Sequence, residues 1–133
     1  MKSNSFPFPV ATLDNFTRGY IDAALWSSID GNDEPLNKNY TISDIEEGSM
    51  QRFVADCAKF QAENDADLDN LLTDFDIDRA NQGHYFWLDR NRHGAGFQDP
   101  NNVGALGKRL ADAARRFGEV DNYETAEDTL IFE

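Results

Sequence analysis

The sequence is poor in cysteine and has no long apolar run. Its 133 residues include one cysteine, Cys57, so no intramolecular disulfide can form and a reducing compartment is expected. No stretch reaches the about 20 apolar residues that a membrane-spanning helix needs. No apolar segment of the secretory type follows the N-terminus. We therefore expect no membrane association and a cytoplasmic location.

Basic residues are also scarce. The chain has 12 lysines and arginines against 25 aspartates and glutamates, which gives a formal net charge of −13. Because phosphate binding needs positive charge, this composition argues against binding duplex DNA directly. The same charge attracts basic partners, including proteins that themselves bind nucleic acid.

Motifs of common enzymes and metal sites are missing as well. His84 and His93 are nine residues apart, whereas a spacing of four places two imidazoles on one helix face. A metal site would need a turn that brings them together. Calcium-loop registers starting at Asp65 and Asp74 both lack the required glycine at the sixth position. With no P-loop or dinucleotide fingerprint either, we expect no catalytic residue, metal or cofactor.

Apolar periodicity predicts a mostly helical α+β fold in a single domain over 1–133. Helical spacing indicates four to five helices, near 13–26, 45–60, 68–75, 79–88 and 103–117. A polar start at Ser43 followed by Glu46 fits a capping box. The pattern then changes, and 119–123 and 129–132 predict two short antiparallel strands, with 95–98 as a candidate third. Two prolines within 1–10 favour an extended N-terminal arm.

One stretch, Gly83 to Asp99, concentrates unusual residue types. It contains both histidines, one tryptophan, two arginines and a Gly-Ala-Gly. Its successive aromatics Tyr85, Phe86 and Trp87 suit either a hydrophobic core or the stacking of nucleobases. We expect this stretch to form the junction between the helices and the small sheet.

The same stretch carries most of a family resemblance. The matching segments are Gly19–Ser28, Pro35-Leu36, Tyr40–Ile45, Asp56-Cys57, Gly83–Phe97 and Gly118–Tyr123. Together they resemble a family of small acidic proteins carried by bacteriophages and other mobile elements. The family has no assigned activity, so the resemblance implies no catalytic residue. It implies a mobile-element accessory protein that works in a bacterial cytoplasm.

The charges are unevenly distributed. Residues 79–118 hold seven bases and three acids, a basic island with a net charge of +4 inside an acidic chain. One interpretation is that these arginines pair with neighbouring acids within the fold. The alternative is a site for an anion, a nucleotide or a single strand, formed by Arg90, Arg92, His93 and His84, in which arginine forks bind phosphate oxygens and histidine supplies acid–base chemistry.

Carboxylates concentrate between residues 56 and 78. The residues expected to form this acidic face are Asp56, Glu63, Asp65, Asp67, Asp69, Asp74, Asp76 and Asp78. Such an array can mimic nucleic-acid phosphates and occupy the basic nucleic-acid-binding surface of another protein. The leading hypothesis is thus a non-enzymatic phage accessory protein that binds a host protein, as anti-restriction or anti-CRISPR proteins do. A structural role in the virion is a further hypothesis.

Overall fold

The computed structural model describes residues 13–93, 96–100 and 103–133. Of these residues, 62% are helical, and they form six α-helices and a two-stranded antiparallel sheet near the C-terminus, so the predicted fold class is confirmed. The elements in chain order are α1 (Asn15–Ser27), α2 (Leu36–Asn39), the 3₁₀ turn η2 (Ile42–Asp44), α3 (Glu47–Glu63), α4 (Asp65–Phe75), α5 (Arg79–Arg90), α6 (Gly104–Arg115), β1 (Asn122–Glu124) and β2 (Leu130–Phe132). The predicted arm at 1–10 lies outside the described residues.

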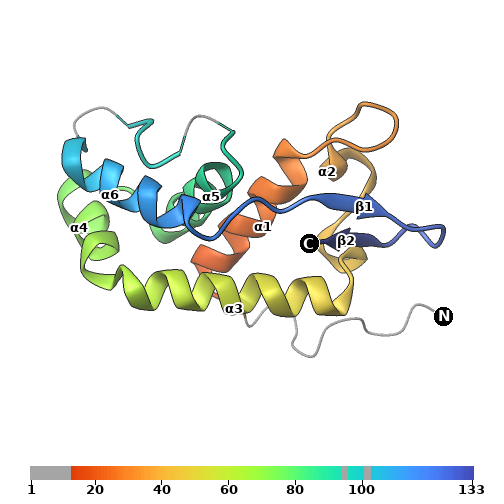
Figure 1. Ribbon diagram of the computed structural model, residues 1–133, viewed down its shortest axis with the longest axis horizontal. Helices are drawn as coiled ribbons and strands as arrows, with labels where there is room; N and C mark the ends of the chain where they lie inside the picture. The colour runs from red at the N-terminus through yellow and green to blue at the C-terminus, as the bar shows by residue number, and fades with distance from the viewer. Residues whose placement is uncertain (1–12, 94–95, 101–102) are drawn as a thin grey trace.

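Helix α3 runs along most of the length of the molecule. Figure 1 shows α4 and α6 near one end of α3, and α2 and the β1–β2 hairpin near the other. The chain crosses back between these ends, so that the last strands lie beside the start of α3. The two ends differ in their secondary structure and hence in the surfaces they can present.

Helices α1 and α5 cross at two glycines. A Cβ atom at Gly19 would lie 1.9 Å from the carbonyl oxygen of Ala80, and one at Gly83 would lie 1.8 Å from that of Phe16. Only a residue without a side chain allows two helix backbones to approach so closely. Gly83, the first residue of the Gly83–Asp99 stretch, is therefore a packing residue.

The core is a cluster of aromatic rings around this crossing. The ring of Tyr20 lies 5.1 Å from those of Phe53 and Phe86 and 5.3 Å from that of Trp87. Phe86 and Phe60 stack at 4.2 Å. These distances are typical of favourable aromatic pairs. Of the three successive aromatics, Phe86 and Trp87 are thus core residues, and only Tyr85 is half-buried.

Hydrogen bonds connect the C-terminal strand β2 to the start of α3. Ser49 Oγ accepts from the Phe132 amide at 2.8 Å and donates to the Phe132 carbonyl at 3.2 Å. Ile45 forms a parallel bridge with Leu130, and Arg52 donates to the Phe132 carbonyl at 2.7 Å. A two-stranded sheet is marginal by itself, so these contacts to α3 stabilise it.

Two local predictions are wrong. The capping box predicted for Ser43 and Glu46 does not form, because Ile45 leaves the helical path to pair with Leu130. Glu46 itself caps α3 by accepting from the Ser49 amide at 2.8 Å. The described residues of the candidate third strand, 96–98, form a turn, in which the Phe97 amide donates to the side chain of Asp89.

Candidate functional site

The predicted acidic face is exposed, but half of it already has internal partners. Six of its eight carboxylates are exposed, and Asp56 and Asp67 are half-buried. Ion pairs join Asp56 to Arg90 at 2.9 Å, Asp67 to Arg109 at 3.0 Å, and Asp69 to Arg79; the side chain of Asp78 caps α5. The face therefore presents less free negative charge than its composition indicates. Its remaining four members are Glu63, Asp65, Asp74 and Asp76.

Arg90 points into the protein. Only 5% of it is exposed, and its guanidinium donates to the carbonyls of Phe117 and Gly118, at 3.0 and 2.8 Å, and to Tyr20 Oη at 3.0 Å and Asp56 Oδ2 at 2.9 Å. All three nitrogens are thus occupied by internal acceptors. The residue joins α5 to α1, α3 and the segment that leads into β1, as expected of a junction.

The other members of the proposed anion site lie apart from these contacts. Arg92 and His93 are exposed after the end of α5, and Arg92 has a φ of 57°. His84 is partly buried in the middle of α5, where its ring lies 5.4 Å from Trp26. Desolvation lowers the pKa of His84, although Asp22 acts in the opposite direction. No contact among the described residues brings Arg90, Arg92, His93 and His84 together.

A second acidic cluster lies at the opposite end of the molecule. The loop before α2, α2 itself, η2 and the β-hairpin surround a hollow of about 380 Å³. The residues that line it are Asp30, Asn32, Glu34, Asn39, Tyr40, Asp44, Glu124 and Asp128. We call this hollow the acidic pocket. Five carboxylates face it, and no lysine, arginine or histidine appears among its described lining residues. One of the five, Glu34, pairs with Lys38, which lies outside the lining.

Asp30 organises one wall of the acidic pocket. Its Oδ1 accepts from the amides of Asn32 and Glu34, at 2.8 and 3.1 Å, and its Oδ2 accepts from Asn39 Nδ2 at 3.0 Å. Hydrogen bonds from Asn39 and from the Glu34 amide lower its pKa. This bonding fixes the loop in one conformation, so the wall does not depend on a ligand for its shape.

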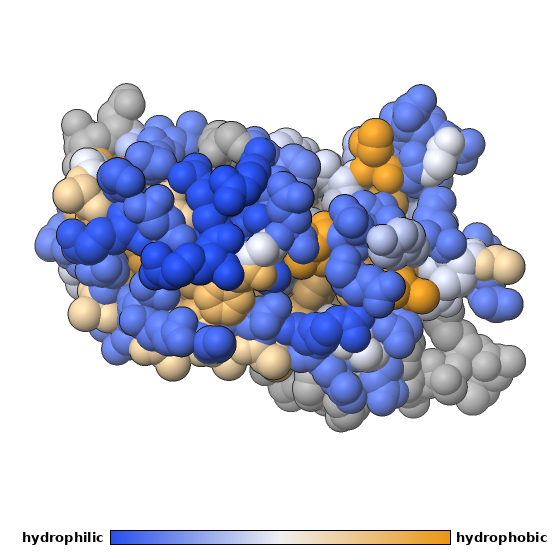
Figure 2. All heavy atoms as spheres, viewed as in Figure 1, coloured by the Kyte–Doolittle hydropathy of each residue, from blue (hydrophilic) through white to orange (hydrophobic). Residues whose placement is uncertain are grey.

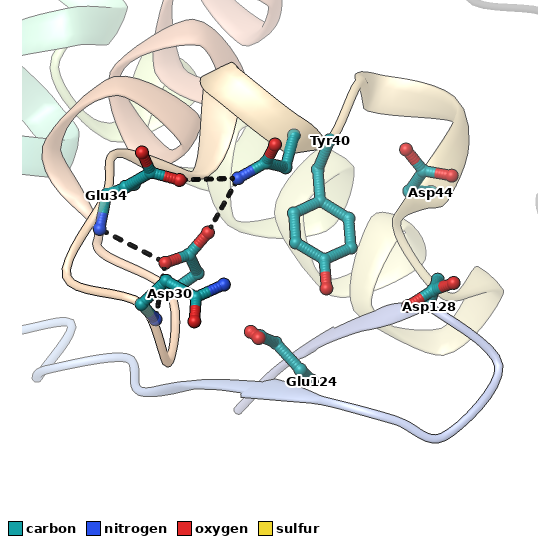
Figure 3. A pocket seen from close by; sticks show the side chains of 8 residues that line it. Asp30, Glu34, Tyr40, Asp44, Glu124 and Asp128 are labelled. Atoms are coloured by element: carbon teal, nitrogen blue, oxygen red, sulfur yellow. Dashed lines mark hydrogen bonds between the residues drawn. The ribbon is translucent and has the colours of Figure 1, made fainter.

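The opposite wall comes from the hairpin, 93 residues further along the chain. Glu124 Oε2 accepts from the amide of Gly31 at 3.3 Å, which joins β1 to the loop. Figure 3 shows the Tyr40 ring between Asp30 and Glu124 on one side and Asp44 and Asp128 on the other. Desolvation, followed by the negative charges of Glu124 and Asp128, raises the pKa of Tyr40. The hydroxyl therefore remains protonated in a strongly negative field.

The chemistry of the acidic pocket favours a cationic group of some size. Within the described residues, no three acidic, histidine or cysteine side chains come together closely enough to hold a metal ion. The carboxylates instead surround a volume within the range of common ligand pockets. An ammonium or guanidinium group would find several acceptors there, with Tyr40 offering a ring for a cation–π contact.

A second hollow, of about 450 Å³, lies between α3 and α6. Its lining contains the acids Asp56 and Glu63, the bases Lys59 and Arg116, and the ring of Phe117. Lys59 lies 5.7 Å from the Phe117 ring centroid. Because the charges of both signs are balanced here, this hollow shows no preference for a ligand of one charge.

The sequence analysis did not connect the acids of 30–34 with the hairpin. The available signal was the match in composition: an acid-rich loop at 30–34 and an acid-rich turn at 124–128. Nothing in the local pattern of either segment indicates that they face each other. The contact depends on the return of the chain along α3.

Comparisons with known proteins give no further indication of function. No protein-family model matches the chain, and searches among curated proteins and among solved structures find no match. Within the described residues, none of the helices combines the length and apolar character needed to cross a bilayer.

Proposed function

We propose that this chain is a non-enzymatic binding protein whose acidic pocket takes a basic side chain from a partner protein. The observation that carries the proposal is the meeting of five carboxylates around one hollow, with no base among its described lining residues. The partner is a host protein with a basic nucleic-acid-binding surface, and the acidic protein occupies that surface in place of nucleic acid. Its setting is that of a phage accessory protein in a bacterial cytoplasm.

Electrostatics supports a protein partner that is basic over an extended area. A net charge of −13 on 133 residues produces a long-range field that accelerates association with a positive surface. The acidic pocket adds a fixed point at which one lysine or arginine can be held by several carboxylates. The exposed acids Glu63, Asp65, Asp74 and Asp76, in and beside α4, supply further negative surface at the other end of the molecule.

The anion-binding alternative has less support. It needs Arg90 to face a ligand, whereas all of the nitrogens of that guanidinium bind acceptors within the fold. Arg92 and His93 are exposed near each other in sequence, but neither lines the acidic pocket or the hollow between α3 and α6.

Two charge-matched variants test the proposal. Glu124→Gln with Asp128→Asn, the pocket variant, removes two carboxylates from the acidic pocket. Asp74→Asn with Asp76→Asn, the α4 variant, removes two at the C-terminal end of α4, where Asp76 is the residue after the helix. Each pair includes one aspartate in the left-handed region, Asp128 with a φ of 59° and Asp76 with a φ of 57°, which asparagine tolerates well. Both variants are therefore expected to fold, and they change net charge equally.

The measurement starts from capture of host proteins from lysate, followed by titration of a purified captured protein at two salt concentrations. We expect a nucleic-acid-binding partner whose affinity falls with salt and which an oligonucleotide displaces. The pocket variant should bind the partner about tenfold more weakly than the wild-type chain, whereas the α4 variant should lose much less affinity. Recovery of no nucleic-acid-handling protein, or equal weakening by both variants, would overturn the proposal.

A further inference from the structure

Two large apolar side chains lie exposed beside the acidic pocket. Trp26, in the last turn of α1, is 56% exposed, and Ile29, which follows the helix, is 57% exposed. We call this pair the apolar ridge. On the face shown in Figure 2, the most hydrophobic surface residues lie toward the end that carries α2 and the hairpin, while hydrophilic residues cover α6.

The fold does not need Trp26 for its core. Its ring contacts that of His84, which is itself only partly buried. The other tryptophan, Trp87, is 1% exposed, and its indole donates to Ser27 Oγ at 2.7 Å. Ser27 thus anchors the end of α1 to α5, and the neighbouring Trp26 ring stays on the surface. Tryptophan is among the residues most enriched where protein interfaces gain their affinity.

The apolar ridge is continuous with the acidic pocket. Ile29 pairs with Pro35 in a β-bridge, and its carbonyl accepts from Asn122 Nδ2 at 3.4 Å, so this residue contacts both the segment before α2 and strand β1. The next residue, Asp30, begins the pocket lining. Between Arg18 and Lys38 the chain has four acids and no base. The apolar ridge therefore has negative charge on both sides, with Asp22 one turn before Trp26.

We infer that the apolar ridge and the acidic pocket form one docking surface for a protein segment that carries an apolar side chain next to lysine or arginine. Charge complementarity selects the cationic residue, and burial of Trp26 and Ile29 supplies affinity that salt does not screen. This inference rests on the proposed function, since it names a second contact of the same partner. It differs from pure charge mimicry, in which any cationic surface of equal charge would bind equally.

Two short peptides of equal charge separate these cases. One alternates lysine with leucine, and the other has serine in place of each leucine. We expect the wild-type chain to bind the leucine peptide about tenfold more tightly, with a shift of tryptophan emission to shorter wavelength as Trp26 is covered. The buried Trp87 supplies a constant background to that signal.

The variants Trp26→Ala and Ile29→Ala should each reduce this preference, while Leu72→Ala, which removes a 39% exposed apolar side chain from α4, should leave it unchanged. Equal affinities of the two peptides for the wild-type chain, or an unchanged preference in Trp26→Ala, would overturn the inference. If the serine peptide binds as tightly as the leucine peptide, the proposed function is supported but the inference about the apolar ridge is wrong. Failure of both peptides to bind at low salt would overturn both.

Discussion

Asp89 is a carboxylate within the basic island that has almost no access to solvent. It is 1% exposed and accepts from the Phe97 amide at 2.8 Å, while Arg115 lies 3.7 Å away. A Cβ at Gly96 would lie 2.3 Å from this carboxylate, so glycine is required where the loop passes over it. Asp89 thereby holds the turn at 96–97 against α5.

The buried position of Asp89 predicts an unusual pH dependence. Desolvation raises the pKa of Asp89, against the opposing effects of the Phe97 amide and Arg115; Asp112 adds to the increase. The folded chain then holds this proton more tightly than the unfolded chain. Its contribution to the free energy of unfolding increases as the pH falls through the raised pKa, and decreases as the pH rises.

The variant Asp89→Asn isolates this effect, because asparagine keeps the acceptor for Phe97 and does not titrate. Urea unfolding gives the free energy of unfolding of both proteins at several pH values between neutral and about pH 4. In the difference between the two proteins at each pH, the contributions of all other titrating groups cancel. The free energy of unfolding of the wild-type protein, relative to that of Asp89→Asn, should increase as the pH falls. A difference that is constant with pH, or that moves the other way, would contradict the assignment.

At the scale of elements, the crossing of α1 and α5 sets the architecture. The variant Gly83→Ala places a methyl group against the Phe16 carbonyl, and the neighbouring atoms are backbone, which cannot turn aside. The two helices must separate, so we expect a loss of about 3 kcal/mol in the free energy of unfolding. Chemical denaturation measures this directly.

Gly31→Ala is the control for that substitution, because a Cβ there would have only the flexible Glu124 side chain nearby, at 3.9 Å. It should change stability by less than about 0.5 kcal/mol. Equal effects of the two substitutions would show that the close approach at Gly83 is not what limits the helix crossing.

The elements also show which parts of the fold can be predicted from sequence. Helices α4, α5 and α6 follow their apolar spacing. The start of α3 was predicted incorrectly because the pairing of Ile45 with Leu130 is a contact between residues distant in sequence. The local conformational preferences of a sequence give no information about such long-range contacts.

The same limit applies to the candidate site. The concentration of carboxylates between residues 56 and 78 was predictable from composition, and pairing of the arginines with acids inside the fold was one interpretation of the sequence. Which acids pair with Arg79, Arg90 and Arg109 was not predictable, because the partners lie 10 to 42 residues away. The acidic pocket joins segments 93 residues apart through the contact of Gly31 with Glu124. Its position depends on the tertiary fold, which periodicity alone does not specify.

At the scale of the whole molecule, charge repulsion and partner attraction come from the same carboxylates. Several exposed ion pairs offset part of the repulsion, such as Lys108 with Asp112 and Lys38 with Glu34. Each such pair contributes at most about 1 kcal/mol. With a net charge of −13, we expect repulsion to be the larger of the two effects on folding.

Folding and binding should therefore respond to salt in opposite directions. Raising NaCl from about 0.01 M to about 0.5 M shortens the screening length from about 30 Å to about 4 Å. We expect the Tm to rise by about 5 °C, since screening relieves repulsion in the folded chain, while the affinity for a cationic peptide falls. Thermal unfolding and peptide titration in the same buffers measure both trends. A Tm that falls with NaCl would mean that the ion pairs outweigh the repulsion, and a peptide affinity that does not change with NaCl would show that the acidic surface is not where the cation binds.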